Sequence, residues 1–297
     1  MNKFLVLGAM ILALAACDER STNVGDPTNP DPTDPPITGG SATRVGDLDA
    51  ASFDDGGTPE LTVQLTLDGN QVNQVYQYVE TLSNGYALFE RQEGTNGRSF
   101  LALAATSSDG RITGVVAQDG GQFNRFFGGA MIEQANFSAP AATAPGAVDA
   151  GNQRYSGSYA GLVNFGPPAH GGVPGLDGST AGTPSIVTGD AFVIADFRSG
   201  ALNGGIYNRV LELGGGIDLI DVILVPGTIF ADGTFAGTVE DIEQNGFGNY
   251  SGAFGGAGAT SMGGILNLGE GFLAGTALEV NADGNEKEYG IFVLDRD

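Results

Sequence analysis

Tryptophan is absent from this chain of 297 residues, and cysteine and histidine each occur once. A single cysteine, Cys17, cannot form an internal disulfide framework or a cysteine-based metal site. A single histidine, His170, cannot form a histidine cluster for a metal. The sequence also lacks a Gly-x-Ser-x-Gly nucleophile elbow and a phosphate-binding P-loop. We therefore expect no enzyme activity, no metal and no cofactor.

Positive charge is scarce as well. Twelve Lys and Arg stand against 35 Asp and Glu, which gives a net charge of −23. A surface of this sign repels nucleic acid and anionic membranes, so we expect no nucleic-acid partner. It attracts basic proteins or cations, although an acidic surface also serves solubility alone.

The N-terminus is typical of a bacterial lipoprotein signal. Lys3 begins a short positive region, and the apolar run Phe4–Leu14 is too short for an ordinary transmembrane helix. The sequence Leu14-Ala-Ala-Cys17 resembles a lipobox. This resemblance implies cleavage before Cys17 and attachment of lipid, palmitate included, to that residue. The alternative is an ordinary secretory signal peptide in which Cys17 has no special role.

Composition divides the remaining chain. Residues 18–44 are rich in proline, which favours an extended, disordered tether with a reach on the order of 80 Å. Residues 45–137 indicate a small β-rich domain, and residues 138–152, rich in Ala, Pro and Gly, indicate a linker. Residues 153–297 contain a succession of short strands without a helical stripe, which is typical of a closed antiparallel barrel. The predicted fold class is all-β.

Alternation and turn dipeptides place the strands. Leu61–Leu67 alternates apolar and polar residues before the turn Asp68-Gly69, whereas Val72–Leu82 fits a strand or a short helix. Further strands of the first domain are expected at Tyr86–Arg91, Phe100–Ala104 and Ile112–Ala117. Strands of the barrel are expected at Tyr155–Phe165, Asp190–Phe197, Leu202–Tyr207, Leu219–Val225, Thr228–Phe230, Thr234–Val239, Gly248–Phe254, Gly264–Leu268, Phe272–Val280 and Tyr289–Leu294.

Residues 250–264 carry a recognisable motif. The pattern Gly-x-Phe-x-Gly-x-x-Ala with a closing Gly-Gly is formed by Gly252, Phe254, Gly256, Ala259, Gly263 and Gly264. It resembles the motif of the transferrin-binding protein B family of Gram-negative surface lipoproteins, which includes factor H binding protein and haemoglobin- or haem-capturing members. Ser261 stands where that family usually has Glu.

The resemblance implies an eight-stranded barrel for the C-terminal half and a handle-like domain for residues 45–137. It also implies a lipid-anchored protein of the cell envelope, in the outer membrane and exposed at the cell surface. Transferrin-binding proteins carry two such lobes, whereas this chain has room for one. The motif residues themselves are architectural and do not name a ligand.

The segment between residues 166 and 184 is the candidate partner-binding loop, because long loops on rigid barrels often carry recognition. Its contact residues are predicted to be Pro167, Pro168, His170, Val173 and Leu176. His170 is either a haem axial ligand, an interface contact or an incidental residue of an exposed loop. Two acidic turns, at residues 54–57 and 283–288, offer oxygen ligands for Ca²⁺, but Asp-Gly turn chemistry explains both.

The sequence therefore predicts a non-enzymatic binding lipoprotein that presents barrel loops to an extracellular protein or a haem protein. The alternatives are a structural envelope lipoprotein without a ligand and a carrier of a lipid or small molecule inside the barrel. A preformed apolar cavity would favour the carrier, and exposed aromatic loop tips would favour the binding protein. A packed barrel with polar loops would favour the structural alternative.

Overall fold

A computed structural model describes residues 37–39, 42–94, 98–120, 126–140, 152–164, 183–269, 271–273 and 286–297. Cys17 and most of the predicted tether lie outside the described residues. Every regular element in the described part of the chain is a β-strand, which confirms the all-β prediction. Two short strands begin inside the segment predicted to be tether, so part of that segment belongs to the first sheet. In the second of them Thr43 and Val45 are buried, which ties the segment to the fold.

The first sheet has nine antiparallel strands in the order β1-β2-β9-β8-β7-β6-β5-β4-β3. Gly46, with φ +72°, bends the chain between β2 and β3, so that β2 pairs with β9 while β3 pairs with β4. The strands are β1 (Ile37–Gly39), β2 (Ala42–Gly46), β3 (Leu48–Asp54), β4 (Glu60–Leu67), β5 (Asn70–Thr81), β6 (Ala87–Gln92), β7 (Ser99–Thr106), β8 (Ile112–Asp119) and β9 (Gly128–Gln134).

The second sheet closes on itself. Its order is β11-β10-β18-β17-β16-β15-β14-β12, and β12 pairs with β11, which completes an eight-stranded antiparallel barrel as predicted. The short β13 adds to the end of β12. The strands are β10 (Asn152–Asn164), β11 (Ser185–Asp196), β12 (Ala201–Leu211), β13 (Ile217–Asp218), β14 (Val222–Ile229), β15 (Thr234–Glu240), β16 (Gly246–Gly255), β17 (Ser261–Leu268) and β18 (Lys287–Arg296).

Several strand predictions are settled by the pairings. Residues 70–81 form a strand, because Tyr76 points into the core while its neighbours Val75 and Gln77 point to solvent. The prediction of two separate strands on either side of Pro226-Gly227 is wrong, since the single strand β14 overlaps both predicted ranges. The register shifts between Leu224 and Thr228, and this bulge accommodates a proline that has no N–H for the ladder. Of the strand predicted at residues 272–280, only the first two residues are described, and they lie in a turn.

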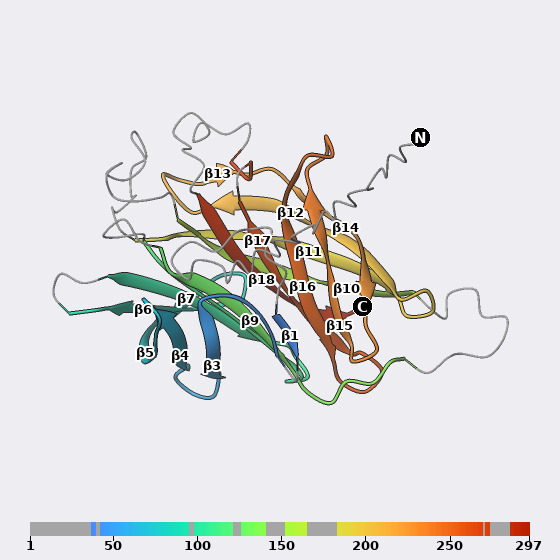
Figure 1. Ribbon diagram of the computed structural model, residues 1–297, viewed down its shortest axis with the longest axis horizontal. Coiled ribbons are helices and arrows are strands. Elements are labelled where there is room, and N and C mark those ends of the chain that lie inside the picture. Colours follow the sequence, from blue (N-terminus) through green and yellow to red (C-terminus); the bar gives the residue numbers. More distant parts are fainter. Residues whose placement is uncertain are drawn as a thin grey trace, which may run out of the picture.

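The two sheets pack against each other through an apolar layer. In Figure 1 the first sheet, blue to green, lies along one side of the yellow-to-red barrel. The layer is formed by side chains from the inner face of the first sheet, such as Leu103 and Ile132, and from the outer face of β10, β16, β17 and β18, such as Ile265 and Ile291. The outer faces of β11, β12 and β14 contribute only one side chain to this layer, Ile186 near the start of β11.

Candidate functional site

The predicted partner-binding residues Pro167, Pro168, His170, Val173 and Leu176 lie outside the described residues. The two attachment points of their loop are described. Strand β10 ends at Asn164, β11 begins at Ser185, and Val163 pairs directly with Ser185. The loop therefore leaves and re-enters the barrel at adjacent positions on one end.

Other connections emerge at the same end of the barrel, because the strand register aligns the residues at which they join the strands. Neighbours along this line pair directly, from Val239 to Gly248, Leu268, Glu288, Val163 and Ser185. This line defines what we call the loop end of the barrel.

The turn between β15 and β16 presents an apolar tip at the loop end. Ile242 is 87 % exposed, more than any other large apolar residue described. The turn is held by the Asp241 carboxylate, which accepts hydrogen bonds from the amides of Glu243 and Asn245 at 2.8 and 2.9 Å. Hydrogen bonds from the Asn245 side chain and amide lower the pKa of Asp241. Sequence reasoning missed Ile242, although an isolated Ile between two acidic residues in a turn was visible.

A buried ion pair lies below the loop end. Arg209 of β12 donates to Glu288 of β18 at 2.5 Å, and both side chains are fully buried. The Tyr159 hydroxyl donates to the other carboxylate oxygen of Glu288, also at 2.5 Å, and Arg209 donates to the Ile220 carbonyl at 2.7 Å. Burial, followed by the adjacent Glu288 charge, raises the pKa of Tyr159 well above its ordinary value. Burial alone would lower the pKa of Arg209, but the charge and hydrogen bond of Glu288 together with Tyr159 and Asp221 raise that pKa.

The pair joins strands that are not neighbours in the barrel, since β12 pairs with β11 and β14 while β18 pairs with β10 and β17. It therefore spans the interior and fixes the distance between the two walls. The buried charges are balanced by each other and are not reached by solvent. This arrangement suits a structural role better than a reactive one.

Aromatic side chains fill the interior beside glycines of neighbouring strands. One cross-strand row runs Phe235, Gly252, Gly264, Phe292 and Tyr159. The next row includes Gly237, Tyr250, Leu266 and Gly290. A Cβ added to Gly264 would lie 2.0 Å from Phe292 Cζ, and one added to Gly237 would lie 2.5 Å from Tyr250 Cζ. Alternation of large and small residues is how a narrow barrel is filled by its own side chains.

The motif residues lie in this construction and at its junction with the first sheet. Gly252 and Gly264 belong to the aromatic row, and Phe254 packs with Phe197 and Phe235 at ring-centroid distances of 4.8 and 5.2 Å. A Cβ on Gly263 would lie 2.6 Å from Ile112 Cγ2 of β8, so this glycine permits the close approach of the two sheets. The remaining motif residues, Gly256 and Ala259, have positive φ angles of 78° and 53° and form the β16–β17 hairpin.

Hydrogen bonds from the first sheet hold that hairpin. The Asp109 carboxylate, in the β7–β8 turn, accepts bonds from Ser107 at 2.7 Å and from Thr260 at 2.5 Å. Burial would raise the pKa of Asp109, but the bonds from Thr260, Ser107 and the Arg111 amide outweigh it and lower that pKa. Ser261 is buried beside the same carboxylate, where a second acidic side chain would meet a like charge.

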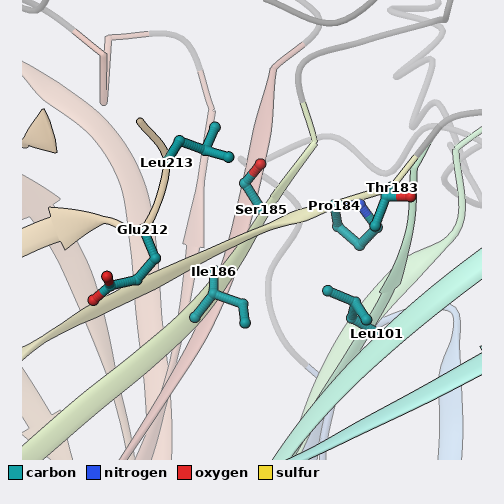
Figure 2. A pocket seen from close by; sticks show the side chains of 7 residues that line it. All are labelled: Leu101, Thr183, Pro184, Ser185, Ile186, Glu212 and Leu213. Atoms are coloured by element: carbon teal, nitrogen blue, oxygen red, sulfur yellow. The ribbon is translucent and has the colours of Figure 1, made fainter. Parts of the chain in front are cut away.

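A shallow pocket opens where the two sheets meet near the loop end. Figure 2 shows Leu101 of β7 facing Pro184 and Ile186 near the start of β11, with Glu212 and Leu213 on the far side. Its volume is about 130 Å³. Small-molecule sites usually measure roughly 300–1,000 Å³, so this pocket is too small for a typical ligand. Neither this pocket nor the filled interior supports the carrier hypothesis.

Within the described ranges, no group of three or more His, Cys, Asp or Glu side chains is arranged to hold a metal ion. At the acidic turn of residues 54–57, the Asp54 carboxylate accepts the Gly56 amide at 2.9 Å, which is turn chemistry. Part of the second acidic turn, residues 283–285, lies outside the described residues. No helix in the described part of the chain has the length and hydrophobicity needed to cross a membrane.

No family profile and no curated protein matches the sequence. Among solved structures, a double mutant of the vaccine antigen transferrin-binding protein B from Haemophilus parasuis Hp5 is 14% identical, with a TM-score of 0.43, over 85% of this chain and 45% of that one. Transferrin-binding protein B from serogroup B Neisseria meningitidis is also 14% identical, with a TM-score of 0.37, over 80% of this chain and 49% of that one. A crystal structure titled surface lipoprotein is 13% identical, with a TM-score of 0.39, over 86% of this chain and 99% of that one.

This chain thus spans about half the length of the transferrin-binding protein B structures that it matches. Several of these structures bear the name of the family that the glycine-rich motif resembles. The likeness is one of fold and says nothing of a ligand.

Proposed function

We propose that this chain is a non-enzymatic binding lipoprotein of the bacterial cell envelope, anchored in the outer membrane through lipid on Cys17. The proposed division is a signal peptide at residues 1–17, a tether, a β-rich domain, a linker and a barrel from residue 153. The loop end of the barrel faces an extracellular protein or a haem protein. A rigid barrel placed beyond a tether is suited to contact partners outside the membrane.

The observation that carries this proposal is the combination of a filled barrel with an apolar tip at the loop end. The interior is occupied by the aromatic rows and the Arg209–Glu288 pair, so recognition has to use the surface. Ile242 is exposed on a turn held by three hydrogen bonds to the Asp241 carboxylate, which limits the entropy lost on binding. The alternative, a structural envelope lipoprotein, predicts no such tip.

The experiment replaces residues 165–182 by a short Gly-Ser turn. Because Val163 and Ser185 pair directly, a tight hairpin can close this gap without moving the strands. We expect the mature protein to retain a serum protein or to bind haemin, and the shortened variant to lose this binding. Phe230→Ser, a change in an exposed residue near the opposite end of β14, is the control and should bind as the natural protein does.

Haemin titration of His170→Ala separates the two partner classes. Loss of a haem absorbance band in this variant supports axial ligation of haem by His170, whereas an unchanged band favours a protein as the partner. If neither haemin nor a serum protein binds the natural chain at the loop end, the binding hypothesis fails and the structural alternative takes its place.

A further inference from the structure

The outer face of β11, β12 and β14 differs from the rest of the barrel surface. Strands β10, β16, β17 and β18 are covered by the first sheet, whereas the face formed by β11, β12 and β14 is open to solvent in the described chain. Outward-pointing side chains at its centre are apolar. They are Phe192, Ile194, Tyr207 and Ile223, which we call the side patch.

Register shows that these residues share one face. Phe192 pairs with Gly205, which in turn pairs with Ile223, so the two side chains lie on either side of a glycine. A Cβ on Gly205 would lie 3.4 Å from Phe192 Cε1, which places the Phe192 ring beside the bare backbone of β12. Ile194 follows two residues after Phe192 on the same strand and is 37 % exposed. The side patch is therefore continuous across three strands.

Tyr207 is held in place by the bulge between β11 and β12. The register shifts between Thr188 and Asp190, and Asn208 has a φ of 52°. The Asn208 amide donates to the Asp190 carboxylate at 2.8 Å, and the Tyr207 ring lies 5.9 Å from that of Phe192. Tyr207 nevertheless remains 38 % exposed. A positioned, partly exposed aromatic side chain is typical of the anchor of a protein interface.

The exposed face of the first sheet shows what an ordinary solvent face of this protein looks like. On β4 and β5 the outward positions are occupied mostly by polar residues, namely Thr62, Gln64, Thr66, Gln71, Asn73 and Gln77, and the two exposed apolar residues, Val75 and Val79, are separated by Gln77. Scattered single apolar residues are normal on protein surfaces, whereas a contiguous group marks an interaction site. The side patch is therefore the exception that needs an explanation.

Negative charge surrounds the side patch. Asp190 pairs with Tyr207, Glu240 pairs with Ile223, and Asp221 precedes Ile223 by two residues on the same face. Residues 183–246 contain nine Asp and Glu but two Arg, of which Arg209 is buried against Glu288. This charge repels anionic lipid and also a second copy of a chain with net charge −23. Only a positively charged partner complements it.

We propose that the side patch is a docking surface for a protein that presents apolar side chains flanked by Lys and Arg. Apolar contacts at the centre supply the affinity, and the acidic rim steers and orients a basic partner. This surface is separate from the loop at residues 165–182 and from the loop end, so it adds a second interaction site to the proposed function.

The test uses three short synthetic peptides as probes: one of Lys and Leu, one in which Ser replaces Leu, and one in which Glu replaces Lys. We expect the Lys-Leu peptide alone to shift the NMR signals of Ile194, Ile223 and Tyr207. The double variant Ile194→Ser/Tyr207→Ser should lose about tenfold or more in affinity, and Glu240→Gln should weaken binding at low salt more than at high salt. Matched controls are Val75→Ser and Glu60→Gln on the first sheet.

Equal binding of the Ser peptide would show that charge alone acts, and equal binding of the Glu peptide would show that charge complementarity is irrelevant. Either result overturns the proposal, as do unchanged affinities of the two side-patch variants. Shortening the loop at residues 165–182 should leave this binding unaffected. The failure of this inference and the failure of the proposed function are therefore distinguishable.

Discussion

Removal of one partner of the Arg209–Glu288 pair should destabilise the barrel far more than removal of both. In Glu288→Gln, the Arg209 cation keeps its bond to the Ile220 carbonyl but loses its counter-ion in a fully buried position. In Arg209→Met, the Glu288 carboxylate keeps the Tyr159 hydroxyl as a donor but loses its cation. In the double variant, the amide that replaces the Glu288 carboxylate still offers an oxygen to Tyr159, and neither charge of the pair remains.

The magnitudes follow from burial. Leaving one charge of a buried ion pair uncompensated costs about 3–5 kcal/mol, whereas replacing both partners with neutral groups is often close to neutral. We therefore expect each single variant to lose about 3–5 kcal/mol of the free energy of unfolding and the double variant to lose less than either. The corresponding coupling energy exceeds about 2 kcal/mol.

Urea unfolding followed by circular dichroism measures these values, with Arg154→Met as the control. Arg154 forms an ion pair with Asp297 at 2.9 Å, but the two side chains are 65% and 41% exposed. Exposed pairs of this kind contribute up to about 1 kcal/mol. Additive losses in the double variant, or equal losses at Arg154 and Arg209, would refute the conclusion that the buried pair spans the interior as a unit.

Two further variants test the packing and the junction. Gly264→Ala should lower the free energy of unfolding by about 1–3 kcal/mol, because its Cβ would lie 2.0 Å from Phe292 Cζ. Adding Phe292→Leu should recover part of that loss. Thermal unfolding measures both effects, and the control Gly246→Ala, whose Cβ would have its nearest neighbour at 3.7 Å, should be nearly neutral. Asp109 has a lowered pKa in the folded state, so its bonds stabilise the protein above the ordinary carboxyl pKa and are lost as pH falls through the lowered value. Asp109→Asn should therefore be less stable than the natural protein near neutral pH, with a difference that shrinks in acid; a difference independent of pH would contradict this assignment.

Local patterns were sufficient to predict most of the strands, because alternation and Asp-Gly turns act over a few residues. Leu61–Leu67 and the turn at Asp68-Gly69 illustrate this. The closure of the barrel with eight strands was implied by the family resemblance, whereas local patterns indicated ten strand ranges. The start of β11 at Ser185 was missed, since Gly189 and the bulge at Thr188 interrupt its alternation. Pro226-Gly227 also interrupts the alternation and therefore suggested a strand boundary, whereas in the structure both residues lie in a bulge of β14.

The candidate site was less predictable. Arg209 and Glu288 are 79 residues apart in sequence, and each resembles an ordinary charged residue near a strand end. Only the closed barrel shows that both point inward. The side patch is hidden for a similar reason, because Phe192, Tyr207 and Ile223 belong to three strands and their common face depends on register. The sequence predicts the alternation of each strand but not which face the first sheet covers.

The most direct test of the central proposal is protease digestion of intact cells that produce the full-length chain. We predict that the folded part is cleaved from the surface of intact cells, and that Cys17→Ser abolishes both lipid labelling and retention in the outer membrane. A periplasmic protein that survives the same treatment confirms that the cells are intact. Protection of the natural chain until the outer membrane is broken would contradict surface binding and favour a structural lipoprotein that faces the periplasm.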